Sequence, residues 1–166
     1  ANYLLVHTLA ESFSMMVAGA ILVLVWNTWE LTADSYLKGL GIAFFFVATL
    51  DLVHTLAYKG MGVFPGYNAN LPTQLWIAAR YLQSISLLVA PTLLGREVRR
   101  WRLLGIYAIV TSALLGLIFV RAFPDCYIPG QGLTLFKIVS EIIIAMLLAL
   151  AILRLVHHRE AFSPDV

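Results

Sequence analysis

Long apolar runs separated by short polar stretches extend along nearly the whole chain. A helix needs about 20 predominantly apolar residues to cross the hydrocarbon core of a bilayer. Five runs reach roughly this length, at about 3–26, 36–58, 73–94, 103–120 and 133–155. The alternating polarity that a membrane β-barrel needs is absent from them. The pattern therefore predicts an all-α fold, a polytopic transmembrane bundle with five spanning helices that forms a single domain over residues 1–166.

Composition supports the membrane assignment. Hydrophobic residues make up 61% of the 166 residues, charged residues make up 12%, and the mean hydropathy is +0.87. A soluble domain carries about a quarter charged residues and a little under half apolar ones. The net charge of +2 is too small to indicate nucleic-acid binding, so the lipid bilayer is the expected partner. The first run is too long for a cleavable signal peptide, and ionisable residues interrupt it.

Basic residues predict the orientation. Four arginines lie within residues 95–102, and the chain leaves its last apolar run through Arg154 and Arg159. The loops on the other side of the membrane carry only Lys59 and Arg121. Cytoplasmic loops of membrane proteins are enriched in lysine and arginine. We therefore expect the 95–102 side and the C-terminus to face the cytoplasm, and the N-terminus to face outward.

Two loops on the outward side, at 59–72 and 121–132, are rich in glycine and proline. These residues favour tight turns, so the loops are expected to cover the mouth of the bundle or simply to form short connections. The chain has one cysteine, Cys126, which excludes an internal disulfide framework and a cysteine-based metal site. On the outward side it could pair with a second copy or another segment.

Apart from Lys38 and Arg154 near the inward ends, the ionisable residues within the apolar runs lie toward the outward ends of those runs. A helix rises ~1.5 Å per residue, so His7 and Glu11 lie ~6 Å and ~12 Å inside the first run. The same count from Tyr58 places His54 ~6 Å deep and Asp51 ~10 Å deep. Three further residues lie in the outer halves of their runs, namely Arg80, Lys137 and Glu141. Ionisable residues are costly inside a membrane and usually mark a function or a buried pair.

Spacings of three or four residues place these groups on common helix faces, as for His7 with Glu11 and Asp51 with His54. We therefore expect side chains from at least four helices to share one outward-facing pocket. The fourth apolar run carries no charge and is expected to lie at the periphery. The candidate ligand-binding residues are His7, Glu11, Asp51, His54, Tyr58, Trp76, Arg80, Tyr81, Lys137 and Glu141.

Several ligands fit these residues. Two imidazoles with adjacent carboxylates suit a transition metal such as zinc, copper or iron. The candidate metal ligands are His7, Glu11, Asp51 and His54. Two histidines on facing helices could instead hold a haem. Arg80 and Lys137 could hold an organic or anionic ligand between the walls formed by Trp76 and Tyr81. The simplest alternative is that the acids and bases only pair with one another and fix the packing.

Blocks of sequence along nearly the whole chain resemble a known family. The most specific are LDLVHTLAYKGMGVFPG at 50–66 and NLPTQLWIAARY at 70–81, and shorter matches lie at 7–11, 123–126 and 132–141. With these blocks the chain resembles the third type of bacterial membrane-associated sensor domain.

The resemblance implies a sensory input module in a bacterial inner membrane that is not itself an enzyme. In the family such modules precede cytoplasmic output domains, namely the histidine kinases of two-component systems or diguanylate cyclases. The family's pattern continues with further helices, so the chain is expected to be truncated on its C-terminal side. A homodimer through the full-length protein is also expected. A metal- or haem-binding membrane redox protein is the alternative, whereas a transporter is disfavoured because the inner halves of the runs are apolar.

Overall fold

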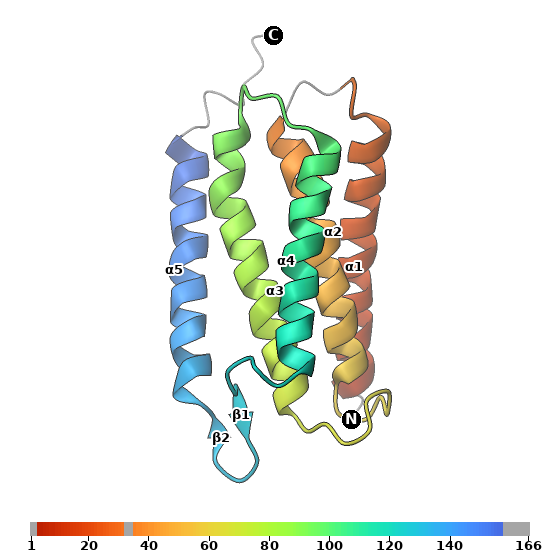
Figure 1. The fold of residues 1–166 in the computed structure, drawn as a ribbon, viewed down its shortest axis with the longest axis vertical. Coiled ribbons are helices and arrows are strands. Elements are labelled where there is room, and N and C mark those ends of the chain that lie inside the picture. Colours follow the sequence, from red (N-terminus) through yellow and green to blue (C-terminus); the bar gives the residue numbers. More distant parts are fainter. Residues whose placement is uncertain (1–2, 32–34, 158–166) are drawn as a thin grey trace.

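The computed structural model describes residues 3–31 and 35–157, in which five long helices lie side by side (Figure 1). The helices are α1 (Tyr3–Asn27), α2 (Ser35–Ala57), α3 (Asn70–Val89), α4 (Arg100–Phe119) and α5 (Leu135–His157). A short 3₁₀ helix, η1 (Ala90–Leu93), extends α3. The strands β1 (Tyr127–Ile128) and β2 (Gly132–Leu133) form an antiparallel hairpin before α5. The all-α architecture is confirmed. Arg159, on which the predicted orientation partly depends, lies outside the described residues.

Consecutive helices run in opposite directions, so the connections gather at the two ends of the bundle (Figure 1). One end holds Tyr3, the loop at 58–69 and the β1–β2 hairpin, and we call it the hairpin end. The other end holds the α1–α2 and α3–α4 connections together with the last turn of α5, and we call it the opposite end. The two loops expected to face outward therefore lie together at the hairpin end.

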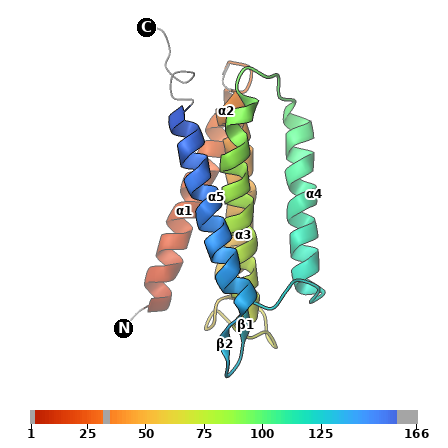
Figure 2. The same ribbon diagram turned by 90° about the vertical axis from the view of Figure 1, so that its left-hand side faces the viewer.

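Helices α2 and α3 form the centre of the bundle. Both are buried along much of their length, and Ile42, Leu50, Leu75 and Ala79 are fully enclosed. Helix α1 packs mainly against α2, α4 packs mainly against α2, and α5 packs against α3. In a second view α4 stands on one side, and α1 leans away from α3 toward the hairpin end (Figure 2). As expected, α4 is peripheral and contributes none of the predicted site residues.

The outer surfaces of the peripheral helices are apolar. Leu9 of α1 is 60% exposed, Ile109 of α4 is 71% exposed and Leu153 of α5 is 64% exposed. A helix that is apolar on all sides is expected where lipid covers the faces that protein does not.

Within the described residues, α1, α2, α4 and α5 are each long and apolar enough to cross a membrane. Helix α3 does not meet this criterion, so the predicted count of five spans is not confirmed. The physical reason is composition, because α3 carries Gln74, Arg80 and Gln83 in addition to two serines.

Candidate functional site

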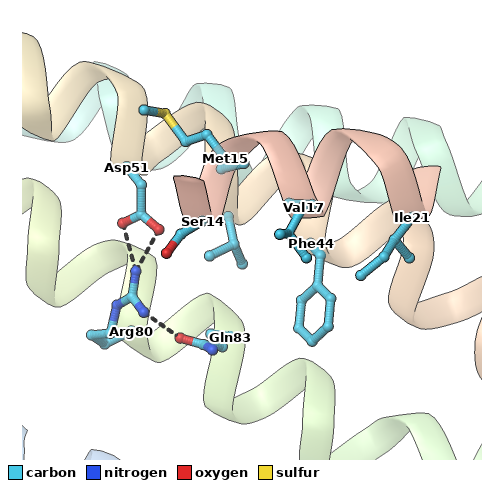
Figure 3. Close-up of a pocket in the computed structure, with 11 residues that line it drawn as sticks. Ser14, Met15, Val17, Ile21, Phe44, Asp51, Arg80 and Gln83 are labelled. Atoms are coloured by element: carbon cyan, nitrogen blue, oxygen red, sulfur yellow. Dashed lines mark hydrogen bonds and ion pairs between the residues drawn. The ribbon is translucent and has the colours of Figure 1, made fainter. Parts of the chain in front are cut away.

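A largely buried ion pair joins the two central helices. Nη2 of Arg80 on α3 contacts both carboxylate oxygens of Asp51 on α2, at 2.6 Å from Oδ1 and 2.5 Å from Oδ2 (Figure 3). Nη1 of the same arginine donates to Oε1 of Gln83 at 2.6 Å. With Ser14 and Met15 of α1, these side chains line a cavity of about 200 Å³. Arg80 therefore supplies the counter-charge that Asp51 needs inside an apolar bundle.

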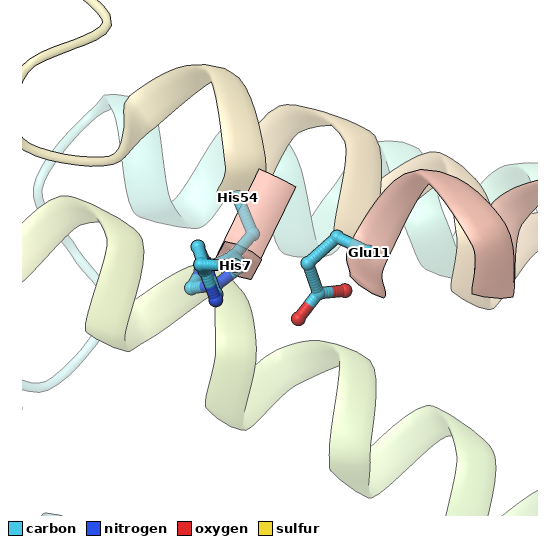
Figure 4. Close-up of side chains that lie close together, drawn as sticks. All are labelled: His7, Glu11 and His54. Atoms are coloured by element: carbon cyan, nitrogen blue, oxygen red, sulfur yellow. The ribbon is translucent and has the colours of Figure 1, made fainter. Parts of the chain in front are cut away.

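A second group of polar side chains lies one turn nearer the hairpin end. His7 and Glu11 of α1 face His54 of α2, and one ligand-capable atom from each residue lies within 4.8 Å of the other two (Figure 4). The rings of His7 and His54 meet edge to face, with their centroids 5.6 Å apart. Two of the predicted helix faces therefore converge at this point.

Hydrogen bonding fixes the tautomer of His54. Its Nδ1 lies 2.8 Å from the backbone carbonyl oxygen of Pro72 in the first turn of α3. A carbonyl oxygen only accepts, so the neutral ring carries its hydrogen on Nδ1 and keeps a lone pair on Nε2. Nε2 of His7 is buried and has no hydrogen-bond partner among the described residues. The cluster thus holds ring nitrogens whose bonding capacity the protein leaves unused.

A larger cavity of about 550 Å³ lies at the hairpin end beside this cluster, and His54 and Tyr58 form part of its wall. Lys137 and Glu141 of α5, an ion pair at 2.6 Å, form another part. Nζ of Lys137 also lies over the ring of Trp76, 5.7 Å from the ring centroid. Segments from α1, α2, α3, the hairpin and α5 therefore surround one space.

A family model accounts for the whole chain. The model of the membrane-associated sensor domain MASE3 matches residues 1–166. The chain belongs to this family. No curated protein and no solved structure matches it. Membership confirms the predicted resemblance and, together with the apolar helices, indicates a membrane protein with a sensory input role.

The MASE3 domain gathers most of the predicted site residues at the hairpin end but divides them into separate groups. The expected single pocket is instead two cavities, one beside Asp51 and Arg80 and the larger one beside His54. Asp51 belongs with Arg80 and does not join His7 and Glu11, because the arginine already holds its carboxylate. Tyr81 lines neither of these two cavities and packs with the apolar residues between α3 and α5.

Two amide side chains of α3 that the sequence pattern did not single out hold the hairpin of the MASE3 domain in place. Oδ1 of Asn70 accepts hydrogen bonds from the backbone N–H groups of Cys126 and Tyr127, at 2.7 and 2.9 Å. Gln74, one turn further along, donates to the backbone carbonyls at 123–124, each at 3.0 Å. Their spacing was the available signal, since amides four residues apart share a helix face.

Cys126, which directly precedes the β1–β2 hairpin, has no exposed surface. Burial, with a contribution from the neighbouring Asp125, raises the pKa of its thiol to about 11. The thiolate is the reactive form of cysteine, so a thiol that stays protonated near neutral pH is a poor nucleophile and a poor metal ligand. In this MASE3 domain Cys126 fills space against Ile77 and Ile144.

Proposed function

We propose that this MASE3 domain senses a small ligand or metal ion at the hairpin end and signals to a cytoplasmic histidine kinase or diguanylate cyclase. The observation that carries the proposal is the cavity of about 550 Å³, whose walls come from four helices and the hairpin. A ligand that touches all of these segments favours the packing in which they lie closest together. Only a difference in affinity between two packings can drive such a signal.

The proposal includes an orientation in which the hairpin end faces the periplasm of a bacterial inner membrane. Three groups of basic residues at the opposite end support a cytoplasmic location for that end, namely Lys38, the arginines within 96–102, and Arg154. Helix α5 links the two ends, because its 23 residues extend about 34 Å from the cavity wall. A change at Lys137 would in this way reach the cytoplasmic side.

We also propose that α3 is a fifth span. It has 20 residues, which is about the length that a helix needs to cross a membrane. Its polar side chains do not oppose this assignment, because Gln74, Ser84 and Ser86 are buried among the other helices and Arg80 is paired with Asp51. A central helix meets little lipid and does not need a fully apolar surface.

The test uses the full-length parent protein, with its kinase or cyclase activity measured in native membranes. Trp76→Leu and Lys137→Met alter the contact between α3 and α5 at the cavity wall. Each is expected to change the output activity about 5-fold or more, which is the lower range of a coupling between distant sites. Trp101→Leu, at an exposed position at the opposite end, is the matched control and should leave the output unchanged.

Normal output from both cavity variants, with membrane levels equal to those of the parent, would show that this cavity takes no part in sensing.

We further propose that the full-length protein acts as a homodimer, as expected for a module attached to a kinase. Cross-linking of the parent protein in native membranes tests that expectation separately.

The alternative of a haem-binding redox protein fits the geometry less well. The ring of His7 packs against Tyr58, with centroids 4.5 Å apart, and stacks on Tyr3 at 5.9 Å. These rings occupy space that a porphyrin held between His7 and His54 would need. A preparation of the parent protein with a visible Soret band, lost in His7→Ala, would restore the haem alternative.

A further inference from the structure

We propose that His7, Glu11 and His54 bind a divalent late first-row transition-metal ion such as Zn²⁺ through two imidazole nitrogens and one carboxylate oxygen. This inference specifies the ligand of the proposed sensory function. Its relevance to signalling rests on that proposed function, but metal binding itself can be tested independently. The sequence predicts four metal ligands, including Asp51. The proposed site omits Asp51, because its carboxylate is paired with Arg80.

Of the three acidic residues deep within the described apolar helices, Glu11 is the one without a basic partner. Among the described residues of the apolar helices, Asp51 pairs with Arg80 and Glu141 pairs with Lys137. Glu11 has no hydrogen-bond or ion-pair partner in the described part of the chain, although it lies well inside α1. A carboxylate in an apolar segment is costly unless a cation or hydrogen-bond donors compensate it. Ion pairing within the bundle therefore does not account for Glu11, whereas a cation bound between it and the two histidines would compensate its charge.

The two histidines are prepared to act as ligands. Because Nδ1 of His54 donates to the carbonyl oxygen of Pro72 at 2.8 Å, its ring is oriented and Nε2 keeps a lone pair. Metal-bound histidines usually donate their second ring N–H to a carbonyl or carboxylate in this way. The unpartnered, buried Nε2 of His7 lies in the same cluster. The hydrogen bond that commonly supports a metal-bound histidine is therefore present at His54, and His7 offers beside it a ring nitrogen that is unpartnered within the described part of the chain.

The chemistry of the three donors selects the class of ion. Imidazole nitrogens favour zinc, copper, nickel and iron, whereas Mg²⁺ and Ca²⁺ prefer sites made only of oxygen atoms. Two histidines and one glutamate are also a known ligand set for Zn²⁺, with a fourth position left for water or another ligand. A second set of three such residues does not occur among the described residues.

Binding would couple the site to the position of α1. The three donor atoms lie within 4.8 Å of one another, whereas ligands of a tetrahedral zinc ion lie about 3.3 Å apart. Two ligands come from α1 and one from α2, so closing that distance draws the hairpin end of α1 toward α2. Helix α1 packs mainly against α2 and leans away from α3 at this end, so the proposed movement is one of α1 against α2 (Figure 2).

The test is metal binding by the full-length protein, purified with a histidine-free affinity tag and stripped with a chelator. Zn²⁺ is titrated in competition with a chromophoric chelator, and Co²⁺ is added separately because its visible d–d bands report the coordination geometry. We expect one tight site per protomer that neither Mg²⁺ nor Ca²⁺ occupies. His7→Gln, Glu11→Gln and His54→Gln should each weaken Zn²⁺ binding more than about 10–100-fold. A loss of about 10–100-fold is typical when a residue that only hydrogen-bonds to a metal ligand is replaced, and loss of a ligand itself should cost more.

His157→Gln and Glu97→Gln, near the opposite end of the bundle, are the matched controls and should bind Zn²⁺ as the parent protein does. Glu11→Gln preserves side-chain volume, so its thermal midpoint without metal separates lost binding from lost folding. Zn²⁺ should raise the midpoint of the parent protein but not that of Glu11→Gln, because only a folded state that binds the ion is stabilised by it.

The metal assignment is overturned if the parent protein shows no tight Zn²⁺ or Co²⁺ site, or if the three ligand variants bind as the parent does. Failure of the sensory role gives a different result. If Zn²⁺ binds through these residues but neither the ion nor Glu11→Gln changes the kinase or cyclase output, the site stands and its sensing role fails. If output depends on Trp76 and Lys137 but no metal binds, the sensing cavity stands and this inference fails.

Discussion

Asp51 and Arg80 are the charges most closely enclosed by the two central helices. The side chain of Asp51 is 7% exposed and that of Arg80 is 24% exposed. A paired charge in a low-dielectric interior roughly offsets its own desolvation cost, whereas a charge that has lost its partner does not. The pair therefore adds little net stability, but any packing of α2 and α3 that separates the two charges is disfavoured.

This asymmetry predicts the outcome of a double-mutant cycle. Asp51→Ala leaves the arginine without its partner, and we expect it to lower the free energy of unfolding by about 3 kcal/mol, the lower end for a buried pair because Arg80 is partly exposed. Arg80→Ala should cost a similar amount, and the double variant clearly less than the sum. Unfolding in detergent, followed by tryptophan fluorescence, measures all three.

Glu30→Gln provides the control for that cycle. Glu30 is 78% exposed and pairs with Arg100 at 3.1 Å, so removing its charge should change the stability by less than ~1 kcal/mol. Simple additivity of the two central substitutions would show that Asp51 and Arg80 act independently.

The depth of these residues could be predicted from the sequence, but their partners could not. Asp51 and His54 are three residues apart, so they point about 60° apart around the helix axis. This rotation is enough to aim Asp51 at Arg80 on α3 and to bring His54 against both Pro72 and His7. The sequence contains the spacing within α2 but not the rotation of α2 relative to its neighbours, and that rotation separates the ion pair from the cluster of His7, Glu11 and His54.

Helices α1 and α2 are in close contact at a glycine of α2. A Cβ atom at Gly41 would lie 2.8 Å from Cγ2 of Val25 and 2.9 Å from its Cβ. Valine is branched at Cβ and has little rotamer freedom in a helix, so it cannot turn away from an added methyl group. The absence of a side chain at position 41 therefore sets the distance between the two helices.

Gly41→Ala is expected to destabilise the bundle although alanine is the better helix former. The gain in helix propensity is about 1 kcal/mol and the cost of overpacking is about 1–3 kcal/mol, so we expect a net loss of up to about 2 kcal/mol. Gly105→Ala on α4 is the matched control, because no atom lies within 4 Å of the added Cβ. Gly105→Ala should be neutral or stabilising in the same unfolding assay. Equal stability of the two variants would show that the contact at Val25 does not limit the approach of α1 to α2.

The helices themselves follow from local sequence, whereas the hairpin does not. Each apolar run contains enough consecutive apolar residues to predict one helix, whatever surrounds it. The β1–β2 hairpin is short, with glycines at positive φ at positions 130 and 132, and Asn70 holds it through hydrogen bonds to residues far along the chain. Such contacts depend on the packed bundle, so only the presence of tight turns could be predicted there.

The whole molecule places its most polar helix at its centre. Helix α3 packs against α2, α5 and α4, and its ten buried residues include glutamine and serine side chains. A hydropathy criterion treats every position as though lipid surrounded it, so it does not count the burial of these polar side chains inside the bundle. The central position of α3 is the argument for the proposed fifth span, whereas length and hydropathy alone identify four candidate spans among the described helices.

Five spans and four spans predict different topologies. With five, the two termini lie on opposite sides of the membrane and the arginine-rich 95–102 loop is cytoplasmic. If α3 does not cross, the termini lie on the same side, and the 95–102 loop shares a side with the 58–69 loop. If the N-terminus faces outward, that arrangement places four arginines outside, against the usual enrichment of basic residues in the cytoplasm. If the N-terminus is cytoplasmic, it places both termini and these arginines inside.

Reporter fusions distinguish the two topologies. Alkaline phosphatase, which is active only outside the cytoplasm, should be active when inserted at Gly62 or Gln131 and inactive at Glu97. A green fluorescent protein that folds only in the cytoplasm should fluoresce after His157 and not at the N-terminus. The same phosphatase result at Gly62 and Glu97, whether both are active or both inactive, would show that α3 stays on one side of the membrane. The Asp51–Arg80 pair would then lie near a membrane surface, where screening by water would weaken it and the coupling expected in the double-mutant cycle would fall with it.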